Sequence, residues 1–127
     1  MNKSWHMSPE DSIERILFHA QPDEGTFLHM LRPYRGVKQD VLVDVLAALK
    51  NAAPFIASAA LSRELASALW AISHLGRLWA LAPNGMLRAN DLITKSDQDR
   101  LNEFLETFDH AVMVLLEGGD VDAAFSR

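Results

Sequence analysis

The stretch Ser62–Ala82, SRELASALWAISHLGRLWALA, carries the pattern that decides the fold class. Apolar residues recur in it every three to four positions, which is the spacing of a helix that packs on a core. With successive residues about 100° apart around the axis, one helix face collects these apolar and small residues: Leu61, Leu65, Ala68, Leu69, Ile72, Leu75, Gly76 and Trp79. Pro83-Asn84-Gly85 then ends the helix. We expect Ser62–Ala82 to be the longest and most buried helix.

The N-terminal half of the chain has the signals of two main helices and one short helix. Ser8-Pro9-Glu10-Asp11 is typical of a helix start, because Ser caps helices and Pro suits the first helical position. Pro22 lies just past the expected end of this helix. Residues 26–31 predict a short helix, and a main helix is expected from about Lys38 to Ala53, where Pro54 ends or kinks it.

The C-terminal part predicts one more main helix. Ser96-Asp97-Gln98-Asp99 is typical of a capping box and opens an amphipathic helix that runs to about Glu117. The connecting loop, residues 86–95, is apolar enough to fold back on the helices, and residues 120–127 add a helical turn or fray. No β-strand is expected. The sequence therefore predicts a single domain over 1–127 with an ordered core of about 8–118: an all-α, compact bundle of four main helices plus one or two short helices.

Composition excludes several classes of protein. Seventeen acidic and twelve basic residues give a net charge of −5, and there is no cysteine. Disulfide scaffolds and thiolate chemistry are excluded, and the acidic balance argues against binding nucleic acid or anionic membranes. The most apolar stretch, Leu65–Ala82, carries His74 and Arg77 and is broken by Gly76, so no segment is expected to span a bilayer. The N-terminus has no apolar signal-peptide core, so a cytoplasmic location is expected.

Metal and catalytic motifs are not found in the sequence. The Glu-x-x-His pairs of di-iron bundles and His-x-x-x-His pairs do not occur. Paired carboxylates, such as Asp97 with Asp99, are expected to face solvent. No metal, cofactor or catalytic residue is predicted, and the sequence favours a non-enzymatic protein over an enzyme. A metal site built from distant histidines stays open. The histidines are His6, His19, His29, His74 and His110.

The central helix carries the first candidate binding site. Trp70, His74 and Arg77 stand at positions i, i+4 and i+7, so their side chains can form one surface opposite the apolar face. In a structural interpretation, Trp70 covers core, His74 is a histidine with its hydrogen bonds satisfied, and Arg77 pairs with a carboxylate on a neighbouring helix. In a functional interpretation, Trp70 anchors a ligand or partner and Arg77 binds an anion.

The second candidate is the turn Arg32-Pro33-Tyr34-Arg35-Gly36. Pro33 and Gly36 shape a rigid turn that presents Arg32, Tyr34 and Arg35, which can bind an anionic ligand or peptide. Alternatively, Tyr34 packs beneath the turn and the arginines cap helix C-termini.

Several segments of the chain resemble a group of proteins, and this resemblance predicts the kind of organism that the chain comes from. Leu31–Gly36, Pro83–Arg88 with Asn90, Leu92 and Ile93, and Ala68-Leu69-Trp70 with Trp79 together resemble a group of small uncharacterised bacterial proteins. The resemblance spans about residues 26–117. It implies a bacterial, cytosolic protein and attaches no activity to it.

Two functional hypotheses follow from these patterns. The first is a non-enzymatic interaction protein that forms a homodimer, because the chain is rich in Trp and Met and its central helix is bulky on both faces. Such a dimer is expected to bury on the order of 1,000 Å² or more. The second is a small-molecule-binding regulatory or sensor domain, with a pocket beside Trp70, His74 and Arg77 that takes a small anionic ligand.

Overall fold

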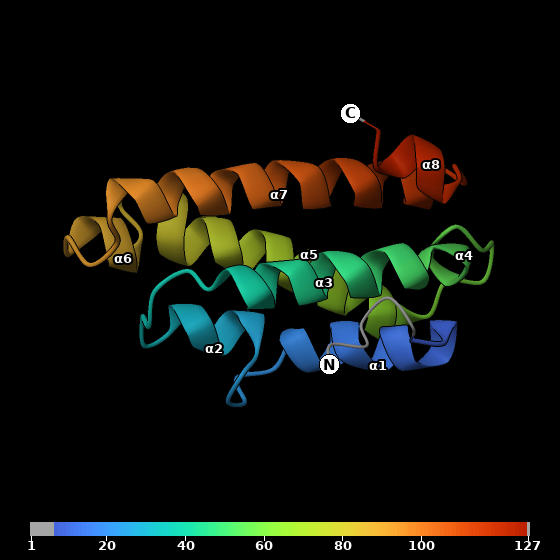
Figure 1. Cartoon of the computed structure of the whole chain (residues 1–127), viewed down its shortest axis with the longest axis horizontal. Helices are drawn as coiled ribbons and strands as arrows, with labels where there is room; N and C mark the ends of the chain where they lie inside the picture. The colour runs from blue at the N-terminus through green and yellow to red at the C-terminus, as the bar shows by residue number, and fades with distance from the viewer. Residues whose placement is uncertain (1–6, 127) are drawn as a thin grey trace.

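A computed structural model describes residues 7–126 and confirms the all-α fold (Figure 1). Four longer helices form the body: α1 (Pro9–His19), α3 (Gln39–Asn51), α5 (Arg63–Gly76) and α7 (Lys95–Leu116). Shorter helices lie between and after them: α2 (Phe27–Leu31), α4 (Ala53–Ile56), α6 (Met86–Ala89) and α8 (Val121–Ala124). The described residues thus hold more short helices than the one or two predicted, and they contain no β-strand. The predicted N-terminal tail lies largely outside the described range.

The longer helices run along the long axis of the molecule (Figure 1). Helix α1 packs against α3 and α5, and α5 packs against α7. The chain enters α5 and α7 from opposite ends, so these two helices are antiparallel. Within residues 7–126, no helix combines the length and apolarity needed to cross a membrane.

The sequence predicts the N-terminal cap of α1 correctly but not that of α7. Ser8 caps α1 as expected, accepting a hydrogen bond from the Asp11 backbone N–H at 3.1 Å. Helix α7 begins earlier than expected, because Thr94 rather than Ser96 is its cap and accepts from the Asp97 backbone N–H at 3.1 Å. Asp97 therefore lies in the first turn, where its carboxylate is free to bind elsewhere.

The longest helix is α7, with 22 residues, so the prediction that Ser62–Ala82 is the longest is wrong. Helix α5 has 14 residues and continues as a five-residue π-helical segment, η2 (Arg77–Leu81). Its last hydrogen bond joins the Ala82 N–H to the Arg77 carbonyl oxygen, five residues back. Ala82 is extended because Pro83 follows it, so the helix ends there.

The core extends from α1 and α3 to the junction of α2, α5 and α7. Four of the five residues of α2 are buried, a larger share than the five of 14 in α5, so α5 is not the most buried element. The Phe27 and Phe104 ring centroids lie 5.4 Å apart, and Phe104 continues the row to Phe108 at 5.8 Å. Gly76 approaches this row so closely that a Cβ would lie 3.2 Å from the Phe27 ring. The core thus holds one edge of α5 and leaves its opposite edge at the surface.

Candidate functional site

Trp70, His74 and Arg77 form one surface on α5 and η2, as predicted. The Trp70 and His74 rings stack with centroids 4.1 Å apart and planes 15° apart. Trp70 is 63% exposed, so the interpretation in which it covers core is wrong. An exposed indole costs hydration free energy that burial against a partner would recover.

Arg77 pairs with a carboxylate on the neighbouring helix, as its structural interpretation predicts. Its Nε and Nη2 donate to Asp109 Oδ2 of α7 at 3.1 and 2.7 Å. The two side chains are 41% and 35% exposed, so solvent screens the pair. Because Asp109 already balances the guanidinium charge, an anion bound at Arg77 would have to compete with it.

An apolar groove of about 510 Å³ lies between α5 and α7, beside this pair. We call it the α5–α7 groove, and its lining is Ala66, Leu69, Trp70, Ser73, Phe108, Asp109, Val112, Met113, Leu116 and Glu117. A second, more polar hollow adjoins it, shares Trp70 and Ser73, and extends to η2 with the lining His74, Arg77, Leu78, Leu81, Ala82 and Asn102. The two hollows together form what we call the α5–α7 face.

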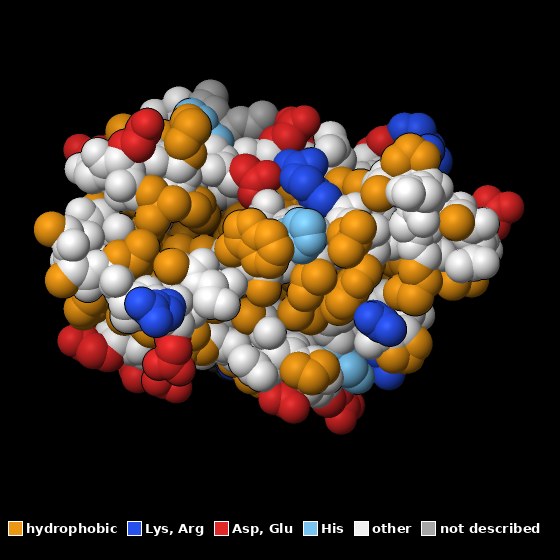
Figure 2. All heavy atoms as spheres, turned by 180° about the vertical axis from the view of Figure 1, so that it is seen from behind, with side chains coloured by type: hydrophobic (Ala, Val, Ile, Leu, Met, Phe, Trp, Pro, Cys, Tyr) orange, Lys and Arg blue, Asp and Glu red, His pale blue; other side chains and the backbone are white. Residues whose placement is uncertain are grey.

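Exposed apolar side chains concentrate on the α5–α7 face. Among the described residues, four of the seven large apolar side chains that are exposed lie there: Trp70 at 63%, Leu78 at 46%, Met113 at 52% and Leu116 at 53%. Figure 2 shows hydrophobic atoms spread across the middle of this side of the molecule, around one histidine and one adjacent pair of opposite charges. A patch of this kind is typical of an interaction surface.

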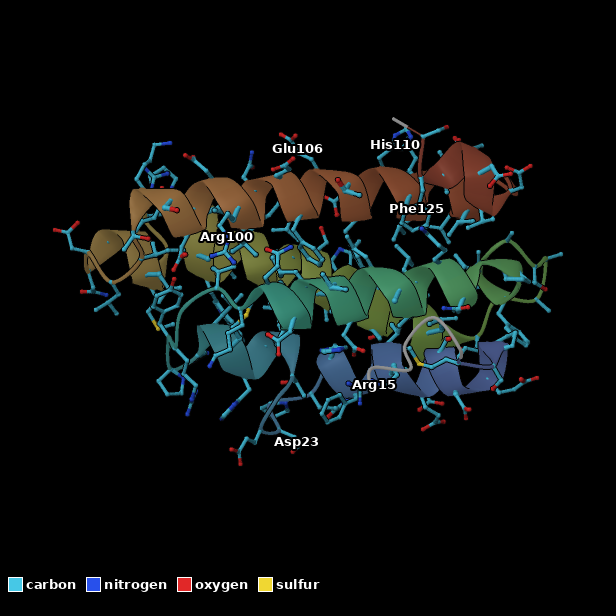
Figure 3. The ribbon with its side chains drawn as sticks, viewed as in Figure 1. Arg15, Asp23, Arg100, Glu106, His110 and Phe125 are labelled. Carbon is cyan, nitrogen blue, oxygen red and sulfur yellow. The ribbon has the colours of Figure 1, made fainter. Side chains whose placement is uncertain are left out.

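A partly buried polar cluster between α1 and α3 was not found from the sequence. His19, 1% exposed, places Nε2 2.7 Å from Asp44 Oδ2, and Arg15 Nη2 donates to the same oxygen at 2.7 Å. His19 Nδ1 accepts the Phe27 backbone N–H at 3.0 Å, which assigns the ring proton to Nε2. Both ring nitrogens are thus engaged, so His19 has no free lone pair with which to act as a base. Figure 3 shows Arg15 on the α1 side of this contact.

The spacing of Arg15 and His19, one helical turn apart on α1, was the only sequence signal of that cluster. Its third member, Asp44, is 25 residues from His19. Only the packing of α1 on α3 brings them together.

The turn after α2 is held to the start of α7 through Tyr34. Its hydroxyl donates to Asp97 Oδ2, which also lies 3.3 Å from the Val37 backbone N–H, while Arg100 donates to Oδ1 at 3.0 Å. Burial disfavours the Asp97 charge, yet these donors outweigh it and lower the Asp97 pKa. Burial, and then the nearby Asp97 carboxylate, raise the Tyr34 pKa. The prediction that Asp97 faces solvent is therefore wrong.

The two arginines of this turn point to local partners. The Arg32 guanidinium lies 5.2 Å from the Trp79 ring centroid. Arg35 Nη1 donates to the His29 and Pro33 carbonyl oxygens, both at 2.8 Å, and so caps the end of α2. The structure therefore separates the two predicted candidate sites, since Trp79 packs on the core and does not line the α5–α7 face.

Potential metal ligands are scattered. Within residues 7–126, no three His, Asp or Glu side chains form a group that could hold a metal ion. His6 lies outside that range. Glu106 and His110 point outward from α7 (Figure 3), and Glu106 accepts a hydrogen bond from Asn102 Nδ2 at 3.2 Å.

Comparison of the chain with family models, with curated proteins and with solved structures finds no match. The geometry of the α5–α7 face is therefore the basis for assigning a function.

Proposed function

We propose that this chain is a non-enzymatic helical interaction protein that associates with itself through the α5–α7 face. The observation that carries the proposal is the concentration of Trp70, Leu78, Met113 and Leu116, each about half exposed or more, around an apolar groove. Burying such side chains is favourable by about 25 cal/mol per Å² of apolar surface. A face of this type is stable in water mainly when something covers it.

The α5–α7 face is large enough for a dimer contact. Residues 63–81 extend roughly 28 Å at 1.5 Å per residue, and two helices side by side are roughly 20 Å wide. Because side chains project from both helices, the accessible area of the face exceeds the product of this length and width and approaches the ~800 Å² per partner of a standard interface.

The charges at the centre of the face also favour an identical partner. The chain carries a net charge of −5, so most surfaces of two copies repel each other. On the α5–α7 face, however, Arg77 balances Asp109 within the chain. The centre of the face therefore adds no net charge to the contact.

Two matched substitutions test the proposal. Leu78 on the face and Val43 on α3 are 46% and 45% exposed, and both are helical. Leu78→Glu is expected to weaken dimerisation at least ~10-fold, as the loss of an interface anchor does, whereas Val43→Glu leaves it unchanged. Sedimentation velocity over a micromolar concentration series measures both. Equal behaviour of the two variants, or a wild-type chain that stays monomeric, would refute the proposal.

A second candidate function is a small-molecule binder, favoured by the volume of the groove. At about 510 Å³ it falls within the ~300–1,000 Å³ of typical ligand sites. Because Asp109 offsets Arg77, an uncharged, largely apolar ligand suits it better than the anion first expected. Native mass spectrometry distinguishes the two: a reproducible extra mass that Trp70→Ala removes supports the binder, and a dimer without extra mass supports self-association.

A further inference from the structure

We propose that two copies pair antiparallel across the α5–α7 face, about a two-fold axis that crosses α5 near His74 and α7 near Asp109. This inference rests on the proposed self-association and specifies its geometry. It predicts which side chains of the second copy meet Trp70 and which end of the second copy lies over the C-terminus of α7.

The position of the axis comes from the extent of the face. Its lining runs from Ala66 to Ala82 along α5 and η2, so its midpoint is residue 74. Along α7 the lining runs from Asn102 to Glu117, with its midpoint beside Asp109. Because an isologous two-fold interface brings the same patch of both subunits together, an axis at these midpoints overlays the whole face of each copy on that of the other.

The same axis pairs the two large exposed side chains of α5 and η2. Trp70 lies four residues before His74 and Leu78 four residues after it. Reversing the second copy therefore places its Leu78 opposite Trp70 and its Trp70 opposite Leu78. Each aromatic side chain, 63% exposed in the single chain, then meets an apolar partner rather than a second indole.

Charge distinguishes this arrangement from a parallel one. Residues 101–126 contain no Lys or Arg, and the C-terminal end carries Glu117, Asp120 and Asp122. The opposite end of the face holds Arg88, which donates to the Leu81 carbonyl oxygen at 2.9 Å rather than to a carboxylate. Antiparallel copies bring Glu117 toward the partner's Arg88 end, whereas parallel copies would stack the acidic ends together.

Single cysteines test the geometry, because the chain has none of its own. His74→Cys lies at the axis and is expected to cross-link to the second copy, by mild oxidation or with a short bis-maleimide that tolerates a longer gap than a disulfide. Val43→Cys, on α3, is the control that should not cross-link.

A distance at the far end of α5 completes the test. Arg63, exposed at the start of α5, lies eleven residues from His74. A spin label on Arg63→Cys is expected about 33 Å along the helix axis from its counterpart in the antiparallel dimer, at 1.5 Å per residue on each side. A parallel dimer would place the two labels at the same level. Pulsed electron paramagnetic resonance measures this distance.

The outcomes separate the geometry from the self-association itself. The antiparallel arrangement is supported if the variants sediment as dimers, His74→Cys cross-links to the second copy, and the two spin labels at position 63 are far apart. A dimer with a short distance at position 63, or without the cross-link at position 74, overturns the arrangement and leaves self-association standing. A monomer in sedimentation overturns both.

Discussion

The two sides of α5 differ in which side chains they bury and which they expose to solvent. Toward α1 and α3, the buried His19 has both ring nitrogens bound, one by Asp44 and one by the Phe27 N–H, while Ser12 Oγ on α1 is buried without a hydrogen-bond partner among the described residues. Toward α7 and solvent, apolar groups such as Trp70 are exposed, and the Arg77–Asp109 pair lies at the surface. The first side is buried within one chain, while the second leaves apolar surface that only a partner can remove from water. Stability and association should therefore respond to different substitutions.

The largest expected effect on stability is at His19. His19→Ala removes two buried hydrogen bonds and leaves a cavity and the unpaired Phe27 N–H, which should lower the free energy of unfolding by about 3 kcal/mol. Urea denaturation measures it. The matched control is His110→Ala, the same chemical change at a position that points outward from α7 and does not line the α5–α7 face, expected within about 0.5 kcal/mol. Similar losses for both would contradict the division between the two sides.

A smaller effect is expected at the turn after α2. Tyr34→Phe keeps the ring and removes the hydrogen bond to Asp97, which should cost about 1–2 kcal/mol of unfolding free energy. The dimerisation constant should not change, because Tyr34 does not line the α5–α7 face. Denaturation at neutral pH and sedimentation measure the two quantities. A variant that dimerises more weakly at full stability would contradict this separation.

The same turn predicts how stability depends on pH. The folded Asp97 pKa is lowered, so its contribution is present above the unfolded value of 3.8 and is lost as the pH falls through the lower folded pKa. The folded Tyr34 pKa is raised, so its contribution is present below pH 10 and is lost as the pH rises further. Tyr34→Phe should make the unfolding free energy depend less on pH, both at acidic pH, where Asp97 is protonated, and at alkaline pH, where Tyr34 loses its proton. A pH dependence that matches wild type would show that the contact does not form in solution.

The smallest expected effect on stability is at the Arg77–Asp109 pair. Both side chains are more than a third exposed, so their coupling in a double-mutant cycle of Arg77→Gln and Asp109→Asn should be at most about 0.5 kcal/mol. The same variants should weaken dimerisation more clearly, because removing one partner leaves an unbalanced charge at the centre of the interface. A large coupling in the monomer with no effect on dimerisation would place the pair among the structural contacts.

Local pattern predicted the helices well and their junctions poorly. Apolar spacing located the four longer helices, and the Ser8 cap follows from its neighbours alone. The π-helical turn before Ala82 and the Thr94 cap depend on how the chain packs, which spacing does not report. The resemblance to bacterial proteins, the dimer and the cytoplasmic location stay predictions.

The candidate site was predictable in part for the same reason. Three residues of one helix, Trp70, His74 and Arg77, share a surface because helical geometry requires it. The groove needs α7 as its second wall, and the sequence does not say which helix packs there. Likewise, the contact between Tyr34 and Asp97 joins residues 63 positions apart. Such partners become visible only in the folded chain.

Sedimentation equilibrium of the unaltered chain tests the central claim most directly. The chain has a mass of 14.2 kDa. Self-association through the α5–α7 face predicts a mass approaching twice that value as the concentration rises through the micromolar range. A mass that stays at 14.2 kDa throughout would contradict the claim and leave the groove to a different occupant.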